Sequence, residues 1–448
     1  MASETRSTRG RPVARSTGGT ASAARACALS VVRRTFEDGA YTDRAMHAAS
    51  RGLDPRDRAL AMRLAYGAVQ RRATLDHVIE RFTDRPADAL DPPLRASLRV
   101  GLYELLWLET AAHAVVHDTV ELAKGSRGHG LANAVMRRAT REGSGLVAGL
   151  DDTTPAAAAI AHSMPEWIVE LWWETLGAQA ARVLLGRCNE PAEHALRANM
   201  MITDADGLAA ALPVAASVPG DPREAVIALE RFDAHSSQLW RDGAFMPQSR
   251  AAMLVAHVVD PQPGERILDL CAAPGGKTTH LAALAGPTGE VVAVERHAGR
   301  ARALVRTAER MHASNVTVVV GDAGHPRDGF DRVLLDPPCS GLGTLQSRPD
   351  LRWRATPESV VGLAGEQARL LSVAAGAVGR GGTLVYSTCT ISPAENERQI
   401  DAFLDDHADF TPVDLRSRFP AWASGPAVLA LPHVHGTDGF FIAALRRA

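Results

Sequence analysis

Between residues 26 and 142, apolar side chains recur every three or four positions along the chain. In the segment after Pro93, this spacing places four leucines on one helix face: Leu94, Leu98, Leu102 and Leu105. Alternation of single apolar and polar residues, which is typical of strands, is scarce in the same region. The pattern therefore predicts an all-helical domain over residues 26–145.

A second pattern begins near Phe245, where FMPQSRAAMLVAHVV predicts a helix and short apolar runs then alternate with helical segments. The predicted strands are Ile267–Leu270, Val291–Val294, Val316–Val320, Val333–Leu335 and Thr383–Tyr386. The predicted helices follow near residues 297–312, 357–378 and 394–407. This alternation is typical of an α/β fold with a doubly wound, mostly parallel sheet, which we expect over residues 246–448.

Three further segments differ in composition. Residues 1–25 are rich in Arg, Ser, Thr, Gly and Ala and predict a disordered basic tail, although an organelle transit peptide has a similar composition. Residues 143–160 form a Gly-, Asp- and Ala-rich connection, and residues 160–245 mix short apolar runs with turns, which predicts a small α/β subdomain. The tryptophans that we interpret as packing residues of its first helix are Trp167, Trp172 and Trp173.

The segment ERILDLCAAPGGKTT, residues 265–279, combines a buried strand, a turn of small residues and the start of a helix. Gly275 and Gly276 carry no side chain that would hold off a ligand, and the helix after them offers unpaired N–H groups. A phosphate-binding Walker loop is excluded because Cys271 stands where that loop needs glycine. We expect a nucleotide-like cofactor on Cys271, Ala272, Ala273, Pro274, Gly275, Gly276 and Lys277.

Acidic residues follow three of the predicted strands. Glu295 ends the second strand, where a carboxylate accepts hydrogen bonds from ribose hydroxyls in dinucleotide-type folds. Asp322 follows the third strand and could meet an adenine amino group, and Asp336 closes the fourth. Each alone fits a helix cap or a solvated turn. Together, at one edge of one sheet, they favour a ligand site.

Two cysteines also follow strand ends at this edge. Cys339 lies in DPPCSGLGT and Cys389 in VYSTCTISPAEN. One buried cysteine is ordinary core, but two beside a cofactor loop suggest thiol chemistry. A helix expected near Pro393 would favour the thiolate of Cys389 through its amino-terminal dipole.

Composition and charge limit the class of protein. The 448 residues indicate two or three domains, and no apolar run is long enough to span a membrane. The first 150 residues carry a net charge of +7 and the remainder −9, so the amino-terminal third is the better candidate for a polyanion-binding surface. Five cysteines without regular spacing indicate a reducing, cytoplasmic compartment, and no cluster with metal-ligand spacing predicts a metal site.

Several motifs resemble a known family. CAAPGGKT, DPPCSGLGT, STCTISPAENE and the ending DGFFIAALRR are similar to motifs of the S-adenosylmethionine-dependent RNA cytosine-5 methyltransferases of the RsmB/Sun (Nol1/Nop2/Sun) group. LRASLRVGLYELLWL, AHAVVHDTVELAK and GLANAVMRRATR resemble the NusB-like RNA-binding domain. This arrangement is closest to the 16S ribosomal RNA branch of the group. Two departures are Glu295, where Asp is common, and Ser249, where an acid usually follows the glutamine.

The resemblance implies a reaction and roles for residues. The chain would transfer methyl from S-adenosylmethionine to C5 of a cytosine in 16S ribosomal RNA through a covalent adduct at C6. Cys389 would be the nucleophile, and Asp336 would hydrogen-bond the base. Cys339 would assist product release, and Lys277 would orient Asp336 or the cofactor. We expect a monomer that binds ribosomal RNA, either naked or in an assembling small subunit, without metal or membrane.

Three alternatives stay open. The substrate could be another RNA such as tRNA, or the fold could be a catalytically inactive RNA-binding regulator. A small molecule or protein could also be the methyl acceptor, but the paired cysteines would then have no clear task.

Overall fold

The computed structural model describes residues 22–322 and 329–448 and separates them into two compact units that divide after Gly149. Most of the expected basic tail, residues 1–21, lies outside the described residues. The first regular element begins at Ala23, where the hydroxyl of Ser22 accepts a hydrogen bond from the N–H of Arg25.

The first unit is helical, as the periodicity predicted. Its helices are α1 (Ala23–Phe36), α2 (Thr42–Ala49), α3 (Pro55–Gln70), α4 (Arg72–Thr83), α5 (Pro92–Trp107), α6 (Ala112–Ala123) and α7 (Gly130–Ala148). Leu94, Leu98 and Leu102 of α5 are buried. Buried Glu104 of α5 pairs with Arg25 of α1, whose Nε donates at 2.7 Å. This pair connects helices that are far apart in the sequence.

The second unit opens with three short helices, α8 (Pro155–Ala161), α9 (Glu166–Leu176) and α10 (Ala178–Arg187). Trp172 is fully buried among them, as expected of a packing residue. Their apolar cluster also includes Leu342 and Ile391. The helices therefore pack against the two loops that carry Cys339 and Cys389.

A small antiparallel sheet follows, with strand order β2-β3-β1-β4. Its strands are β1 (Ala195–Ala198), β2 (Ala216–Ser217), β3 (Ala225–Ala228) and β4 (Phe245–Pro247), and its helices are α11 (Ala205–Ala211) and α12 (Gln238–Arg241). The helix expected from Phe245 was wrong at its start. Residues 245–247 pair with β1, and α13 (Arg250–Val259) begins only after Pro247. Proline at that position ends the strand and disfavours a helix through it.

The main sheet has nine strands in the order β11-β12-β13-β9-β8-β5-β6-β7, and β10 pairs with β13. The parallel strands are β5 (Arg266–Leu270), β6 (Glu290–Glu295), β7 (Val316–Val320), β8 (Phe330–Leu335) and β9 (Val378–Thr388). All five predicted strands fall inside them. The antiparallel strands, which sequence reasoning missed, are β10 (Phe410–Pro412), β11 (Ala423–Ser424), β12 (Ala427–Ala430) and β13 (Phe440–Arg447). The sheet is therefore mixed.

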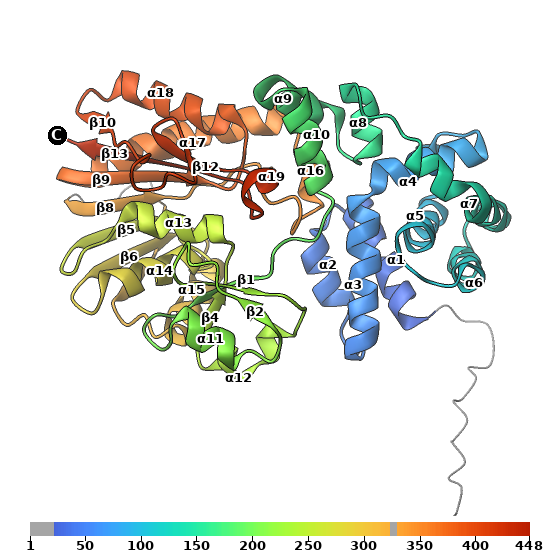
Figure 1. Ribbon diagram of the computed structural model, residues 1–448, viewed down its shortest axis with the longest axis horizontal. Coiled ribbons are helices and arrows are strands. Elements are labelled where there is room, and N and C mark those ends of the chain that lie inside the picture. The colour runs from blue at the N-terminus through green and yellow to red at the C-terminus, as the bar shows by residue number, and fades with distance from the viewer. Residues whose placement is uncertain (1–21, 323–328) are drawn as a thin grey trace, which may run out of the picture. The chain divides into compact units, whose positions relative to one another are not determined.

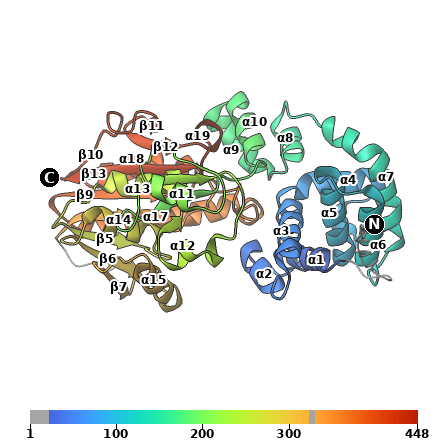
Figure 2. The same cartoon turned by 60° about the horizontal axis from the view of Figure 1, so that its bottom comes forward.

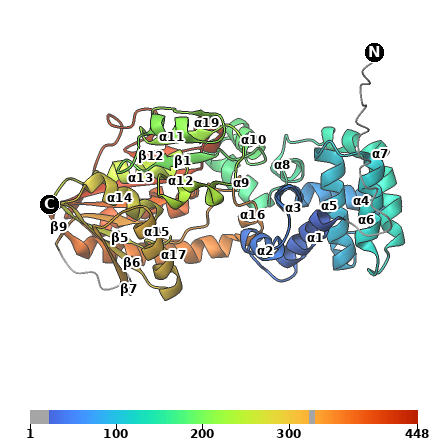
Figure 3. The same cartoon turned by 90° about the horizontal axis from the view of Figure 1, so that it is seen from below.

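Helices cover both faces of this sheet, which the three views of Figures 1, 2 and 3 let the reader follow. One face packs on α13, α14 (Gly276–Ala285) and α15 (Ala298–Arg310). The other packs on α17 (Pro357–Ala377) and α18 (Glu397–Asp406). The short helices α16 (Leu351–Arg354) and α19 (Pro432–His435) lie in connections. This layering is the predicted doubly wound architecture, and it places the carboxyl ends of β5, β6, β8 and β9 at one edge.

Candidate active site

The turn between β5 and α14 has the geometry of a ligand loop. Gly275 has a φ of 104°, and a side chain there would place its Cβ 2.5 Å from Leu304. Only glycine fits this backbone and this space. Gly276 begins α14, so the first N–H groups of the helix point out of the turn. Cys271 itself has a φ of 64° and packs against the core, and burial raises the pKa of its thiol to about 12.

The predicted acidic residues differ in their surroundings. Glu295, at the end of β6, is buried, and one carboxylate oxygen accepts the N–H of His297 at 2.9 Å. Arg300 Nε lies 3.5 Å from its other oxygen. The side chain of Asp322 is 64% exposed and borders residues 323–328, which lie outside the described residues. Glu295 is therefore buried between two neighbours, whereas the exposed Asp322 carboxylate lies 4.0 Å from Arg369 Nη2.

Asp336 joins the cofactor loop to the cysteine strands. Its Oδ2 accepts a hydrogen bond from Lys277 Nζ at 2.8 Å, and its Oδ1 accepts one from Ser387 Oγ at 3.0 Å. Burial alone would lower the pKa of Lys277, but the charge of Asp336 and the hydrogen bond to it raise that pKa above its usual value. The lysine therefore stays charged beside the carboxylate.

The two predicted cysteines lie side by side. The Sγ atoms of Cys339 and Cys389 are 3.2 Å apart, although 50 residues separate them in the sequence. Both thiols are free, and each is only partly exposed. The backbone N–H of Gly343 donates to the carbonyl of Cys389 at 3.0 Å, so the two loops are also joined through the main chain.

Buried Glu395 connects the same two loops, and sequence reasoning did not single it out. Its carboxylate accepts the N–H of Ser340 at 2.8 Å and the hydroxyl of Ser340 at 2.5 Å. The side-chain amide of Gln367 donates to it at 3.1 Å and to the carbonyl of Pro338 at 2.9 Å. Glu395 and Gln367 together thereby fix the backbone on both sides of Cys339.

Electrostatics distinguish the two thiols. The hydrogen bond from Cys339 is the main reason that the pKa of Cys389 is lowered; burial and Asp336 act in the opposite direction, and the charge of Lys277 lowers this pKa further. The same hydrogen bond, followed by burial, raises the pKa of Cys339 well above its usual value. The arrangement favours a thiolate on Cys389 and a protonated thiol on Cys339.

Asp269 is a further residue at this edge that the sequence reasoning passed over. It lies in β5 and is buried, and its Oδ2 accepts the hydroxyl of Thr278 at 2.6 Å. Its Oδ1 has no hydrogen-bond partner within the described residues. An orphaned buried oxygen beneath the loop, together with the glycine turn, fits a site completed by a polar ligand. Burial raises the pKa of Asp269 to about 7.

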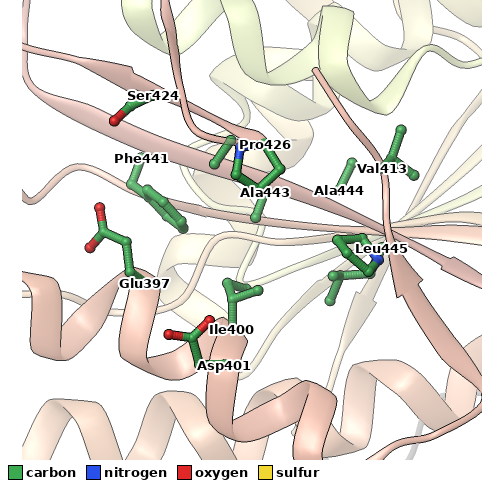
Figure 4. A pocket seen from close by; sticks show the side chains of 12 residues that line it. Glu397, Ile400, Asp401, Val413, Ser424, Pro426, Phe441, Ala443, Ala444 and Leu445 are labelled. Atoms are coloured by element: carbon green, nitrogen blue, oxygen red, sulfur yellow. The ribbon is translucent and has the colours of Figure 1, made fainter. Parts of the chain in front are cut away.

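A cavity of about 120 Å³ lies elsewhere, between α18 and the antiparallel strands (Figure 4). Its lining includes Glu397, Ile400, Asp401, Phe441, Ala443 and Leu445, and none of the predicted site residues. It is therefore separate from the cysteine pair. Across the described part of the chain, no helix combines the length and the apolar character that a membrane span requires.

Two protein families match separate parts of this chain. Residues 256–446 match the family described as 16S rRNA methyltransferase RsmB/F, and residues 22–141 match the NusB family. The probable ribosomal RNA small subunit methyltransferase B of Synechocystis sp. is 36% identical over 95% of this chain and 99% of its own. Its counterpart in Bacillus subtilis is 32% identical over 94% of this chain and 98% of its own.

Among solved structures, a methyltransferase homolog protein from Pyrococcus horikoshii aligns with a TM-score of 0.57 and 27% identity. The alignment covers 65% of this chain and 97% of that one. The family matches fall on the two parts of the chain that carry the helical unit and the site described above. The chain belongs to the RsmB/F family of 16S rRNA methyltransferases and carries a NusB-family domain at its amino end.

Proposed function

We propose that this protein transfers a methyl group from S-adenosylmethionine to C5 of a cytosine in small-subunit ribosomal RNA. The observation that carries the proposal is the pair of thiols 3.2 Å apart beside Asp336 and the glycine loop. A methyltransferase acting on an oxygen or nitrogen nucleophile needs no second thiol. C5 of cytosine is a poor nucleophile, so covalent activation by one thiol and release aided by another give both cysteines a task.

The loop residues suit the cofactor. The free N–H groups at the start of α14 would receive its carboxylate, and Glu295 would accept hydrogen bonds from the ribose hydroxyls. Asp322 remains the candidate for the adenine amino group. When bound, S-adenosylmethionine supplies a methyl group on a positively charged sulfur. Residues 271–277, which the sequence predicts as the cofactor loop, would hold the cofactor.

Cys389 starts the reaction on the base. Its thiolate adds to C6 of the cytosine, a carbon–sulfur bond forms, and the C5–C6 π electrons move into the ring so that C5 becomes nucleophilic. Asp336 would accept a hydrogen bond from the ring edge while Lys277 and Ser387 hold its carboxylate in place. The target base must leave any helical stack to reach these groups.

Cys339 completes the cycle. C5 would take the methyl group while the bond between that methyl and the sulfonium sulfur breaks, which leaves S-adenosylhomocysteine. The C5 hydrogen would then leave as a proton to water, the electrons of that bond would restore the C5–C6 double bond, and the C6–sulfur bond to Cys389 would break. Cys339 lies within 3.2 Å of the departing sulfur, where its thiol can donate a hydrogen bond to the Cys389 thiolate as that thiolate leaves C6. Its placement depends on Glu395, which binds the adjacent Ser340.

The substrate assignment rests on the relatives. The Synechocystis and Bacillus proteins are both named probable ribosomal RNA small subunit methyltransferase B, and each aligns with nearly all of this chain. The excess of positive charge in the first 150 residues supports contact with RNA. We propose that the protein acts as a monomer on 16S RNA, with naked RNA and assembling subunits as the two forms to compare.

A labelling experiment tests the proposal. Purified protein is incubated with methyl-labelled S-adenosylmethionine and, separately, small-subunit RNA, assembling subunits, tRNA or protein alone. We expect label in 5-methylcytidine after nuclease digestion of the ribosomal RNA. Label in tRNA only would correct the substrate, label in another nucleoside or in protein would contradict the chemistry, and cofactor binding without transfer would favour an inactive regulator.

A further inference from the structure

Two charged residues of the small sheet reach the helix that begins the cofactor loop. Arg197 in β1 is 2% exposed, and Glu224, just before β3, is 1% exposed. Neither residue was predicted to belong to the site. Both side chains contact α14. Arg197 binds Gly276 and Thr279, which follow it by 79 and 82 positions, and Glu224 lies against His280.

Arg197 binds the glycine turn directly and through a relay. Its Nη1 donates to the carbonyl of Gly276 at 2.5 Å, and its Nη2 donates to Thr279 Oγ1 at 2.9 Å. The Thr279 hydroxyl donates in turn to the carbonyl of Gly275 at 2.8 Å. Nη1 also donates to Gln248 Oε1 at 2.7 Å. Both glycines of the loop are therefore held by one guanidinium.

The position of this arginine is costly for stability. Burial lowers the pKa of Arg197 to about 9, and the negative charge of Glu224 only partly offsets that effect. The acceptors named above are neutral oxygens, so desolvation of the cation is not balanced by a direct carboxylate pair. An apolar side chain would fill the space at lower cost. This cost points to a geometric role for the hydrogen bonds.

Glu224 also reaches α14, where it contacts His280 without a hydrogen bond, because neither ring nitrogen of His280 has a hydrogen-bond partner within the described residues. Its Oε1 lies 2.8 Å from Nε2 of His257 on α13 and 2.9 Å from Nε2 of His280 on α14. His280 is buried, and its pKa is lowered to about 3 by burial first and by the charge of Arg197 next, so it is neutral. A carboxylate from the small sheet thus meets α13 and α14 together.

Glu224, His257 and His280 could be considered as metal ligands, because their donor atoms lie within 4.8 Å of one another. Two nitrogens approach one oxygen at hydrogen-bond distance, however, whereas donor atoms around a zinc ion with bonds of about 2.1 Å lie roughly 3.4 Å apart. The nearby guanidinium of Arg197 would also repel a cation. These contacts favour an anchor over a metal centre.

We infer that Arg197 and Glu224 are positioning residues for the cofactor. They fasten the first two turns of α14 to the small sheet, so the N–H groups and the glycine turn are preorganised before the cofactor arrives. The inference rests on the proposed function, since it assigns the loop to S-adenosylmethionine. It gives residues 195–247 a task in cofactor binding that their sequence did not indicate.

A matched pair of variants tests this role. Arg197→Met removes the hydrogen bonds to α14, whereas Arg352→Met removes an equally buried arginine of the same unit that donates to the carbonyls of Ser163 and Cys188. Calorimetry with S-adenosylmethionine and S-adenosylhomocysteine should give a Kd raised about tenfold or more for Arg197→Met and changed less than about twofold for Arg352→Met.

Two further readouts separate positioning from general stability. Hydrogen exchange of residues 272–285 should quicken in Arg197→Met and not in Arg352→Met, and KM for the cofactor should rise with kcat nearly unchanged. Thr279→Val keeps the side-chain shape and should change the exchange rate and KM for the cofactor in the same direction by a smaller amount. This variant replaces Arg197→Met in the test if Arg197→Met does not fold.

Equal effects of the two arginine variants on Kd and exchange would overturn the inference while leaving the proposed function intact. Wild-type protein that binds cofactor but transfers no methyl group would instead contradict the proposed function. Stoichiometric zinc in the purified protein, lost in Glu224→Gln, would overturn the assignment of Glu224 as an anchor.

Discussion

The thiols of Cys339 and Cys389 lie 3.2 Å apart at the ends of two neighbouring parallel strands, β8 and β9. The loops after these strands could diverge, yet Glu395 and the Gly343 to Cys389 main-chain hydrogen bond hold them together. This fixed juxtaposition lets one thiol act as a thiolate and the other as its hydrogen-bond donor.

Removal of the Glu395 carboxylate should loosen the loop of Cys339. Glu395→Ala leaves the N–H of Ser340 and the amide of Gln367 without their buried acceptor, which costs about 3 kcal/mol for donors of this kind. We expect a fall in Tm of several degrees and a larger loss of methyl transfer. Glu395→Gln keeps one acceptor oxygen, so its Tm and its methyl-transfer activity should lie between those of Glu395→Ala and wild type. Wild-type Tm and activity in Glu395→Ala would show that the carboxylate is not structural.

Asp336 should matter for the rate more than for folding. Asp336→Asn weakens both the pairing with Lys277 and the acceptor for the base, so kcat should fall about 100-fold or more. Ser387→Ala removes only the other hydrogen bond to the carboxylate and should cost about tenfold or less. Single-turnover kinetics with saturating cofactor measures both. An order of effects opposite to this one would contradict the assignment.

The pH dependence of adduct formation should report the hydrogen bond between the thiols. Cys389 reacts as a thiolate, so the rate of addition rises as pH increases through its lowered pKa. Cys339→Ala removes the main cause of that lowering, and the rise should move to higher pH. The measurement is the rate of covalent RNA attachment in Cys339→Ala and in wild type. A rise that stays in place, or moves to lower pH, would refute this coupling.

Asp269 should make the apoprotein less stable as pH rises. Burial raises its pKa in the folded state to about 7 from the ordinary 3.8, so the folded protein holds a proton that the unfolded chain loses. The free energy of unfolding therefore falls as pH rises from the lower of these two pKa values to the higher. Asp269→Asn should therefore show a higher Tm than wild type at about pH 8, with the difference shrinking toward about pH 4. Asp405→Asn, at an exposed position, serves as the control and should show no such trend.

The sequence predicted the parallel strands because each contains a short run of apolar and β-branched residues, and three of these runs are followed directly by Glu295, Gly321 and Asp336. It did not predict β11 and β12, whose two and four residues are too short to show a period, or β4, whose three residues precede a helix and look like its first turn. These short strands exist because of pairing with distant segments, which no local pattern records.

The site residues likewise divide into those that the sequence predicted and those that only the structure reveals. Cys389, Cys339 and the loop carry recognisable motifs, and these residues lie at neighbouring strand ends because parallel strands share an edge. Arg197 and Glu224 lie outside the recognised motifs, and Glu395 lies inside STCTISPAENE, where nothing marked it as a link between the two loops. Arg197 and the carbonyl it binds are 79 residues apart, so only the folded chain reveals the contact.

The most direct test of the central claim asks which of the two cysteines forms the covalent bond to RNA. Cys339→Ala, Cys389→Ala and the double variant are incubated with small-subunit RNA and S-adenosylmethionine, then run on a denaturing gel. The account predicts an RNA-linked protein band with Cys339→Ala and none with Cys389→Ala or the double variant. A band with Cys389→Ala that the second substitution abolishes would show that the roles are exchanged and would contradict the account.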